Sequence, residues 1–267
     1  MAATGKNNQG KNDSKRNNLK KNATDFKEKI SNGEPMRLNK FLSDAGVCSR
    51  RQADRYVEQG RILVDGEPAQ MGQKVHAGQD IRVDGKRVSV SRKQIVLAVN
   101  KPKGIVCTTE KREKDNIVDF IGYPERIYPV GRLDKDTEGL LLLTNDGELA
   151  HRLLSPKKHV DKTYYARIDG KVDEEDQRAF LQGVDIGDET KTAPAKLEIL
   201  KSADISEILL TIQEGRFHQV KRMFQARDKQ VIYLKRMTMG PLVLGDDLPK
   251  GNYRELCEEE RKALERV

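Results

Sequence analysis

The apolar positions of residues 36–90 follow first the period of helices and then that of strands. Over Leu38–Ala45 they recur at i, i+3, i+4 and i+7, which predicts a short amphipathic helix. Ser49 and Gln52 have the spacing of a capping box, so a second helix is expected directly after Ser49. Two short apolar segments, each followed by Asp-Gly, are typical of strands that end in tight turns. The pattern predicts a small α+β domain of two helices and a hairpin.

Strand patterns become denser from residue 95 onward, with helical segments between them. Apolar or alternating stretches predict strands at Ile95–Val99, Tyr164–Ile168, Leu197–Leu200, Glu207–Ile212 and Val231–Leu234. Long-range pairing of these strands would give a mixed α/β sheet, and residues 91–94 are expected to be a linker. The predicted fold class is α+β, with a small domain at 36–90 and a larger mixed α/β-sheet domain at 95–267.

Positive charge is concentrated at the front of the chain. Lys and Arg outnumber Asp and Glu by 50 to 42, a formal net charge of +8. Residues 1–35 have eight basic and four acidic side chains, and residues 36–90 have ten and seven. In residues 91–267 the two kinds are almost balanced, at 32 and 31. A basic front end suits an anionic polymer such as nucleic acid, because Lys and Arg that bind phosphates release counterions. The alternative, a charged surface that only solubilises the protein, stays open.

Residues 1–35 are rich in Asn and Lys and have no apolar period that would bury a face. They are therefore expected to form a disordered tail. The tail either adds nonspecific affinity for nucleic acid or is a dispensable solvated extension.

Several classes of protein are excluded by what the sequence lacks. Its apolar runs, such as Leu140–Leu143, are far shorter than the ~20 residues of a membrane helix, and the polar N-terminus has no secretory segment. The three cysteines show no CxxC spacing, so we expect reduced thiols without a disulfide or a zinc site. Dinucleotide and phosphate-loop motifs are missing as well. We expect a cytoplasmic protein without membrane contact, metal or cofactor.

Three segments are dense in residue types that carry out chemistry. They are NKPKG at Asn100–Gly104, VGRLDKDTEGL at Val130–Leu140 and EGRFHQVKRMF at Glu214–Phe224. Asp134 lies between two glycines in a loop before an apolar run, and loops of that kind present side chains to ligands. Arg132 nearby, and the distant Lys221 or Arg222, could keep its carboxylate ionised, as a nucleophile requires.

A second interpretation of the same loop is a magnesium-dependent nuclease, because Asp136 and Asp146 follow Asp134 along the chain. A turn at Asp146-Gly147 before a helix would point Asp146 away from such a site, so this interpretation is the weaker one. The histidines show no metal-ligand spacing, and His218 is expected at the surface or in a loop.

Residues 37–85 resemble the S4 RNA-binding domain over their whole length. The resemblance predicts that basic side chains on the two helices bind RNA phosphates, for which guanidinium and ammonium groups are suited. These side chains are Arg37, Lys40, Arg50, Arg51 and Arg55. Each of them alone is typical of a solvated surface charge, so the prediction depends on the group.

The three segments, in this order behind an S4-like domain, resemble the RsuA type of pseudouridine synthase, which includes the related large-subunit rRNA enzymes. The resemblance covers residues 36–262 and implies a catalytic domain that isomerises uridine in RNA without a cofactor. It implies that Asp134 is the catalytic aspartate, that Tyr164 packs on the target base and that Lys221 pairs with Asp134, Arg222 being the alternative. Whether Asp134 attacks the ribose carbon or removes a neighbouring proton stays open.

Other basic residues of the second domain are also candidates for the site. Arg132 is placed with the catalytic residues, and the expected RNA contacts of the second domain are Lys101, Lys103, Arg216 and Arg222. Tyr164 also has a simpler interpretation, because it alternates with Ala166 and Ile168 as a core tyrosine of a strand would.

The segment EGRFHQVKRMF, together with Gly183-Val184 and Lys191–Ala195, is most similar to the branch that acts on 16S rRNA. We therefore expect a monomeric enzyme whose partner is 16S rRNA or a small-subunit assembly intermediate. The alternatives are a 23S rRNA enzyme of the same family and a noncatalytic ribosome-associated RNA-binding protein.

Overall fold

The computed structural model describes residues 35–76, 78–88, 93–155 and 158–267. The chain divides into two units between Gln94 and Ile95, each with a hydrophobic core of its own. The predicted tail, apart from Pro35, and residues 91–92 of the predicted linker lie outside the described residues.

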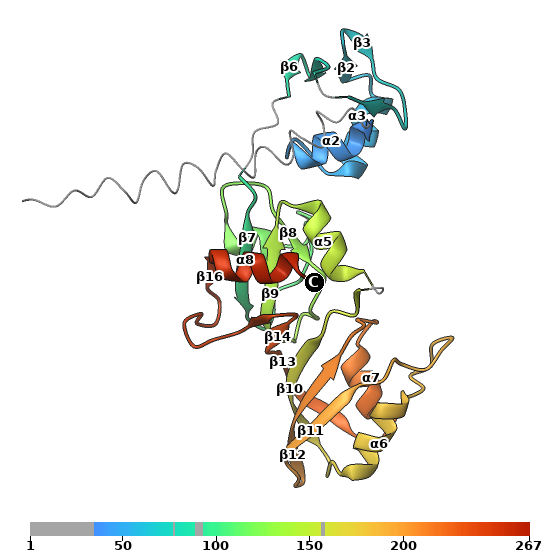
Figure 1. The fold of residues 1–267 in the computed structure, drawn as a ribbon, viewed down its shortest axis with the longest axis vertical. Helices are drawn as coiled ribbons and strands as arrows, with labels where there is room; N and C mark the ends of the chain where they lie inside the picture. Colours follow the sequence, from blue (N-terminus) through green and yellow to red (C-terminus); the bar gives the residue numbers. More distant parts are fainter. Residues whose placement is uncertain (1–34, 77, 89–92, 156–157) are drawn as a thin grey trace, which may run out of the picture. The chain divides into compact units, whose positions relative to one another are not determined.

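The described residues of the first unit form two helices and a four-stranded antiparallel sheet (Figure 1). The helices are α2 (Leu38–Asp44) and α3 (Arg50–Glu58). The sheet has the order β3-β2-β5-β6, with β2 (Ile62–Val64), β3 (Glu67–Pro68), β5 (Ile81–Val83) and β6 (Lys86–Arg87). A separate pair joins β1 (Met36–Arg37) to β4 (Lys74–Val75). Apolar side chains of both helices pack against those of β2 and β5 in one core.

Local signals account for this unit. The Ser49 side chain accepts a hydrogen bond from the Gln52 N–H, and the Gln52 side chain accepts one from the Ser49 N–H, which confirms the capping box. Both Asp-Gly dipeptides have positive φ at their two residues, as a type I′ turn requires. The two turns close separate hairpins, β2–β3 and β5–β6, so the expectation of a single hairpin is wrong.

The second unit is built on an eight-stranded mixed sheet with the order β11-β12-β10-β13-β9-β7-β16, and β8 pairs with β9 (Figure 1). The strands are β7 (Val96–Lys101), β8 (Tyr128–Val130), β9 (Glu138–Thr144), β10 (Lys162–Asp169), β11 (Lys196–Lys201), β12 (Ile205–Ile212), β13 (Gln230–Arg236) and β16 (Tyr253–Glu255). A short pair, β14 (Thr238–Met239) and β15 (Leu242–Val243), lies outside this sheet. Five of the strands are those that the sequence predicts.

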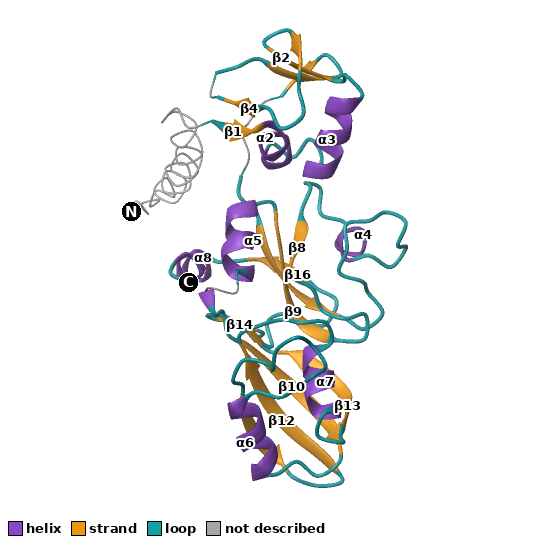
Figure 2. Ribbon diagram, turned by 90° about the vertical axis from the view of Figure 1, so that its right-hand side faces the viewer, coloured by secondary structure: helices purple, strands orange, loops and turns teal. Residues whose placement is uncertain are grey.

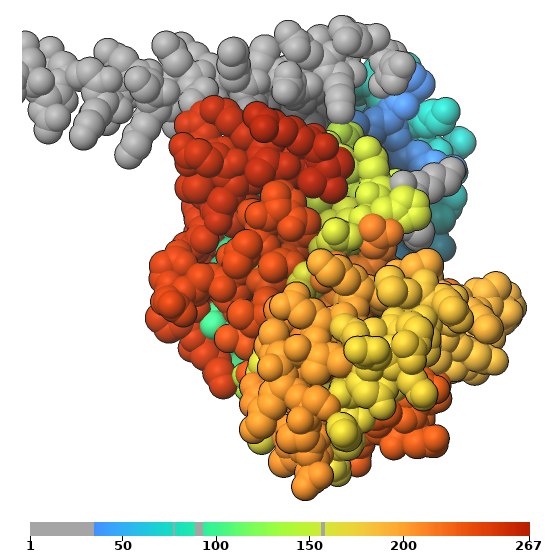
Figure 3. Space-filling model, turned by 60° about the horizontal axis from the view of Figure 1, so that its bottom comes forward, coloured from blue at the N-terminus to red at the C-terminus, as the bar shows by residue number. Residues whose placement is uncertain are grey.

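Helices pack against both faces of the sheet. They are α4 (Ile117–Ile121), α5 (Gly147–Leu154), α6 (Glu174–Gln182), α7 (Gln219–Gln225) and α8 (Glu258–Glu265). Figure 2 shows α4 on one side of β8 and β9, and α5 and α8 on the other. α6 and α7 share one core with β10 and β12, and in Figure 3 the yellow and orange segments gather in one lobe beside the red C-terminal segment.

This arrangement explains two kinds of strand sequence. β7 and β9 are buried along their whole length, because core clusters lie on both faces, and they have the unbroken apolar runs Ile95–Val99 and Leu140–Leu143. β10 and β12 bury every second residue, because helices cover one face, and their sequences alternate.

The two halves of the sheet meet where β9 and β13 run parallel to each other. Their register contains two pairs, Lys235 with Glu138 and Arg236 with Gly139. Gly139 has φ +103°, and a Cβ at this position would lie 2.2 Å from the Arg236 carbonyl oxygen. The Arg236 Nε donates to the Leu140 carbonyl at 2.7 Å. Glycine is therefore required here by backbone conformation and by the close approach of the neighbouring strand.

We expect Gly139→Ala to lower the free energy of unfolding by at least about 2 kcal/mol, because positive φ and a backbone clash act together. Gly187→Ala is the matched control: Gly187 has φ +78° but open space around the added Cβ. It should cost about 1 kcal/mol from backbone strain alone. Urea unfolding of the full chain measures both losses, and equal losses would contradict the role given to the β9–β13 junction.

Candidate active site

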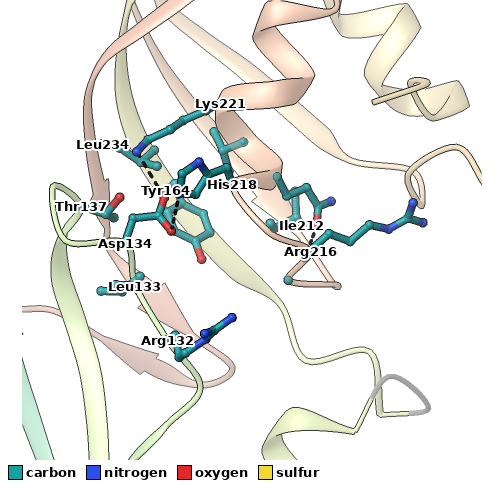
Figure 4. A pocket seen from close by; sticks show the side chains of 13 residues that line it. Arg132, Leu133, Asp134, Thr137, Tyr164, Ile212, Arg216, His218, Lys221 and Leu234 are labelled. Carbon is teal, nitrogen blue, oxygen red and sulfur yellow. Dashed lines mark hydrogen bonds and ion pairs between the residues drawn. The ribbon is translucent and has the colours of Figure 1, made fainter. Parts of the chain in front are cut away.

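Asp134 lies in the loop between β8 and β9, and its carboxylate points into a pocket built from both halves of the sheet (Figure 4). Tyr164 comes from β10, Leu234 from β13, and His218 and Lys221 from the start of α7. The pocket is lined by Arg132, Leu133, Asp134, Thr137, Tyr164, Ile212, Gly215, Arg216, His218, Gln219, Val220, Lys221 and Leu234. The structure thus brings together four segments that are far apart in the sequence.

Lys221 is the cation that pairs with Asp134. Its Nζ lies 3.2 Å from Asp134 Oδ2, and it also donates to both oxygens of Asp136 at 2.7 and 2.8 Å. Burial by itself lowers the pKa of Lys221, but the hydrogen bond to Asp136 and the charge of Asp134 outweigh it, so the net shift is upward. A lysine that stays protonated supplies the positive charge that a nucleophilic carboxylate needs.

Arg222, the alternative partner, points elsewhere. Its guanidinium donates to the Ile186 carbonyl and forms an ion pair with Asp188 at 2.5 Å. The side chains of neighbouring helical residues point about 100° apart, so only one of the two can face the loop. The structure decides the question that the sequence left open in favour of Lys221.

Lys101 is completely buried, and its side chain is hydrogen-bonded to the Asp134 loop. Its Nζ donates to the carbonyl oxygens of Thr137 at 2.8 Å, Pro102 at 3.0 Å and Asp134 at 3.1 Å. Burial lowers the pKa of Lys101, although nearby acidic groups oppose this shift. The expectation that Lys101 contacts RNA is wrong, because its ammonium is enclosed and bonded to backbone carbonyls of the loop.

Cys107 is a second support of this loop. Its buried Sγ accepts a hydrogen bond from the Leu133 N–H at 3.3 Å, and the Gly104 N–H donates to the Lys135 carbonyl at 2.8 Å. Burial raises the pKa of the Cys107 thiol, so it is protonated at neutral pH. The NKPKG segment and the residues after it therefore position the Asp134 loop. The sequence gives no signal for Cys107, because a cysteine outside any motif is typical of a core position.

His218, which the sequence predicts at the surface or in a loop, lies in the loop directly before α7 and also lines the pocket. Its Nε2 lies 3.6 Å from Asp134 Oδ1, and its backbone is left-handed with φ +48° at the N-cap of α7 (Figure 4). A non-glycine residue in this conformation is strained, and such residues cluster at functional sites. No local sequence signal predicts this backbone conformation, which is why the contact was missed.

Tyr164 is a core tyrosine that also lines the pocket, and its packing on the target base stays a prediction. Its side chain is 7% exposed and belongs to the main core cluster, and its ring also lines the pocket beside Asp134. An aromatic ring that is fixed by core packing forms a rigid wall for a planar base.

The other residues predicted to contact RNA differ in their exposure and in their hydrogen bonds to the protein. Arg132 is exposed and lines the pocket, and Lys103 is exposed with its Nζ 5.2 Å from the centre of the Tyr233 ring. Arg216 donates to the carbonyl oxygens of Thr190 and Lys191 at 2.6 and 2.8 Å, so its guanidinium first serves to hold that loop. RNA contacts by Arg216 and Arg222 stay predictions, with both groups engaged by the protein.

The basic side chains of the first unit are mostly open to solvent. Arg37, Arg50, Arg51 and Arg55 are exposed, and Lys40 pairs with Asp44 at 2.7 Å within α2. Their phosphate contacts stay predictions.

Asp146 lies away from Asp134. It caps α5 by accepting hydrogen bonds from the Glu148 and Leu149 N–H groups at 2.9 and 3.1 Å. The carboxylate cluster of the nuclease interpretation is therefore not formed, and the described residues hold no group of three His, Cys, Asp or Glu side chains placed for a metal ion. Within the described ranges, no helix is long and apolar enough to cross a membrane.

Comparison with known proteins agrees with the fold and the site. The family model for RNA pseudouridylate synthase matches residues 95–226, and that for the S4 domain matches residues 36–81. The crystal structure of a pseudouridylate synthase superposes with a TM-score of 0.64 at 36% identity, over 86% of this chain and 99% of that chain.

Three relatives are similar over most of their length. An uncharacterized RNA pseudouridine synthase of Bacillus subtilis, YtzG, is 46% identical over 86% of this chain and 98% of its own. The ribosomal large subunit pseudouridine synthase B of the same organism is 42% identical, over 85% and 95%. The ribosomal small subunit pseudouridine synthase A of Pasteurella multocida is 40% identical, over 84% and 97%.

Fold and site together define an RNA-modifying isomerase that has an S4 domain in front of a pseudouridine synthase domain. The chain belongs to the RsuA/RluB/RluF family of RNA pseudouridine synthases.

The hydrogen bond between Lys221 and Asp136 leads to a testable pH dependence. Asp136→Asn removes an interaction that raises the pKa of Lys221, so Lys221 should lose its proton at lower pH. The alkaline decline of the single-turnover rate should move to lower pH, while the rate at pH 7 changes little. Release of tritium from C5-labelled uridine in RNA measures this rate.

Asp115→Asn is the control for this profile, because Asp115 is 61% exposed and pairs with Lys135 at 3.5 Å. Its alkaline limb should coincide with that of the wild type. An Asp136→Asn profile that also coincides would contradict the electrostatic role of Asp136.

Proposed function

We propose that the protein converts one uridine of 16S rRNA to pseudouridine, with Asp134 as the catalytic carboxylate. The observation that carries this proposal is the meeting of Asp134, Lys221 and Tyr164 in one pocket, with the ion pair at 3.2 Å. These groups supply a carboxylate, a compensating charge and an aromatic wall, and each comes from a different part of the chain.

The reaction is an isomerisation, so atoms and charge balance within the nucleoside and water. The bond from N1 to ribose C1′ breaks, the base turns while it is held, and C5 bonds to C1′. C5 loses its hydrogen as a proton, and N1 takes one up. Asp134 acts at the ribose, either on C1′ or on a neighbouring proton, and the charge of Lys221 beside it is preorganised before the substrate arrives.

The target uridine must leave its stack to reach Asp134. A base inside an RNA helix is out of reach of a pocket, and extrusion costs about a few kcal/mol of stacking and pairing. Tyr164 replaces part of that stacking, since its ring is held by the core and lines the pocket. Arg132, exposed at the same pocket, is suited to a phosphate next to the target.

The S4 domain would bind the RNA while the second domain carries out the chemistry. Its exposed arginines on α3, Arg50, Arg51 and Arg55, are free of the ion pairs described for this unit and can bind phosphates without regard to sequence. Positioning by the S4 domain and catalysis by the second domain therefore use separate surfaces.

The choice of 16S rRNA depends on the segments that distinguish this branch in the sequence. In the structure these segments are hydrogen-bonded to one another: Arg216 bonds the exposed loop at Thr190 and Lys191, and the buried Val184 N–H donates to the Thr192 side chain at 3.0 Å. Arg216 also lines the pocket. An exposed loop that Arg216 holds beside the pocket can read RNA shape. A relative named for the large ribosomal subunit and one named for the small subunit have nearly the same sequence identity to this chain, 42% and 40%. Overall sequence identity therefore does not distinguish the two targets.

The direct test maps pseudouridines by carbodiimide labelling and reverse transcription in 16S rRNA, 23S rRNA and partly assembled small subunits. Wild type should add one new pseudouridine in 16S rRNA or the assembly intermediate. Asp134→Asn should lower its rate of formation by at least about 10³-fold, because the acting carboxylate is lost. Asp136→Asn, which changes the neighbouring carboxylate, should give the wild-type map at pH 7.

Each outcome of this map bears on one part of the proposal. A new pseudouridine only in 23S rRNA would overturn the target and keep the chemistry. Turnover by Asp134→Asn would overturn the catalytic role. Tight binding of both RNAs without any new pseudouridine would favour the noncatalytic interpretation.

A further inference from the structure

Phe217 is the most exposed large apolar side chain in the described parts of the chain, at 67%. It lies in the loop between β12 and α7, directly before His218. A single exposed apolar side chain is common on protein surfaces and by itself indicates nothing. The surroundings of Phe217 make its exposure significant.

The Phe217 ring is stacked on the His218 ring. The two centroids are 3.9 Å apart and the planes differ by 16°. On its other side His218 reaches the active site, where its Nε2 lies 3.6 Å from Asp134 Oδ1 (Figure 4). Phe217 is thus separated from the catalytic carboxylate by the thickness of one side chain.

The backbone that presents Phe217 is fixed on both sides. The Phe217 carbonyl accepts from the Arg222 guanidinium at 3.1 Å, and the Arg216 N–H donates to the Gln219 side chain at 2.9 Å. His218 is held in the left-handed conformation that lets the two rings stack. A rigid, solvent-facing aromatic surface next to a catalytic pocket has the properties of a stacking platform.

We propose that Phe217 stacks against a nucleobase that neighbours the target uridine in the bound RNA. The inference rests on the proposed function and adds a positioning residue to it. When the uridine is extruded, the adjacent base loses a stacking partner, and the Phe217 ring supplies a new one. Aromatic stacking tolerates every base, so Phe217 places the strand and does not read its sequence. A nucleobase is favoured over a protein partner because the ring continues directly from the catalytic pocket, where Arg132 is exposed.

The chain contains no Trp, which allows a spectroscopic test. Phe217→Trp introduces a single indole whose emission, excited at 295 nm, should be quenched when a 16S rRNA transcript binds. Leu181→Trp is the matched control, because Leu181 is 57% exposed on α6 and does not line the pocket. Its emission should stay unchanged. Unquenched emission of Phe217→Trp at saturating RNA would overturn the proposal.

Binding and turnover give the second readout. Phe217→Leu should raise the RNA concentration for half-maximal binding about tenfold, because one base stack is lost. Its single-turnover rate at saturating RNA should stay within about twofold of wild type, and Phe217→Tyr should restore the affinity. Equal affinities of the Leu variant and wild type would contradict the proposal, as would a Tyr variant as weak as the Leu variant.

The proposed function and the proposed stacking of Phe217 fail in different ways in these measurements. If wild type binds RNA but releases no tritium from C5-labelled uridine, the proposed function fails. Quenching of Phe217→Trp and the affinity series still decide the stacking contact in that case.

Discussion

The contact of Gly139 with Arg236 is the constraint on which the rest of the second domain depends. Two residue pairs between β9 and β13 join a half sheet that carries the Asp134 loop to one that carries Tyr164, His218 and Lys221. A glycine at this point lets the two backbones approach more closely than any Cβ would allow. The ion pair between Asp134 and Lys221 joins the two halves of the sheet, and the loop that carries Asp134 is held by Lys101 and Cys107.

Charged groups in the interior reinforce that geometry. Lys101, Lys162 and Arg236 are buried, and each donates to backbone carbonyl oxygens: Lys101 to the Asp134 loop, Lys162 to Val160 and Arg236 to Leu140. Burial of such cations is costly unless their donors are satisfied. The Asp134 carbonyl also accepts from the Thr137 N–H at 3.1 Å, so the Lys101 ammonium adds a second hydrogen bond to it. Buried charge is used for positioning, and the exposed groups Arg132 and Phe217 remain available for substrate.

Much of the fold follows from local sequence, and the site follows in part. The capping box at Ser49 and the alternating strands β10 and β12 are predictable, since their signals lie within a few residues. The position of Asp134 in the pocket agrees with the specific family segment around it, and its catalytic role stays a prediction. The role of Lys101 is not predictable, because its burial depends on carbonyls 33 to 36 residues away. The choice between Lys221 and Arg222, and the contact of His218, depend on how α7 begins, which only the tertiary structure fixes.

The most direct test of this account compares the two cations that the sequence could not separate. Single-turnover tritium release at saturating RNA should fall roughly 10²-fold for Lys221→Met, because the charge preorganised beside Asp134 is lost. For Arg222→Met it should stay within about tenfold of wild type, since Arg222 bonds Ile186 and Asp188 and not the catalytic loop. Equal losses, or a larger loss for Arg222→Met, would contradict the assignment of Lys221 and with it the pocket assembled across the β9–β13 junction.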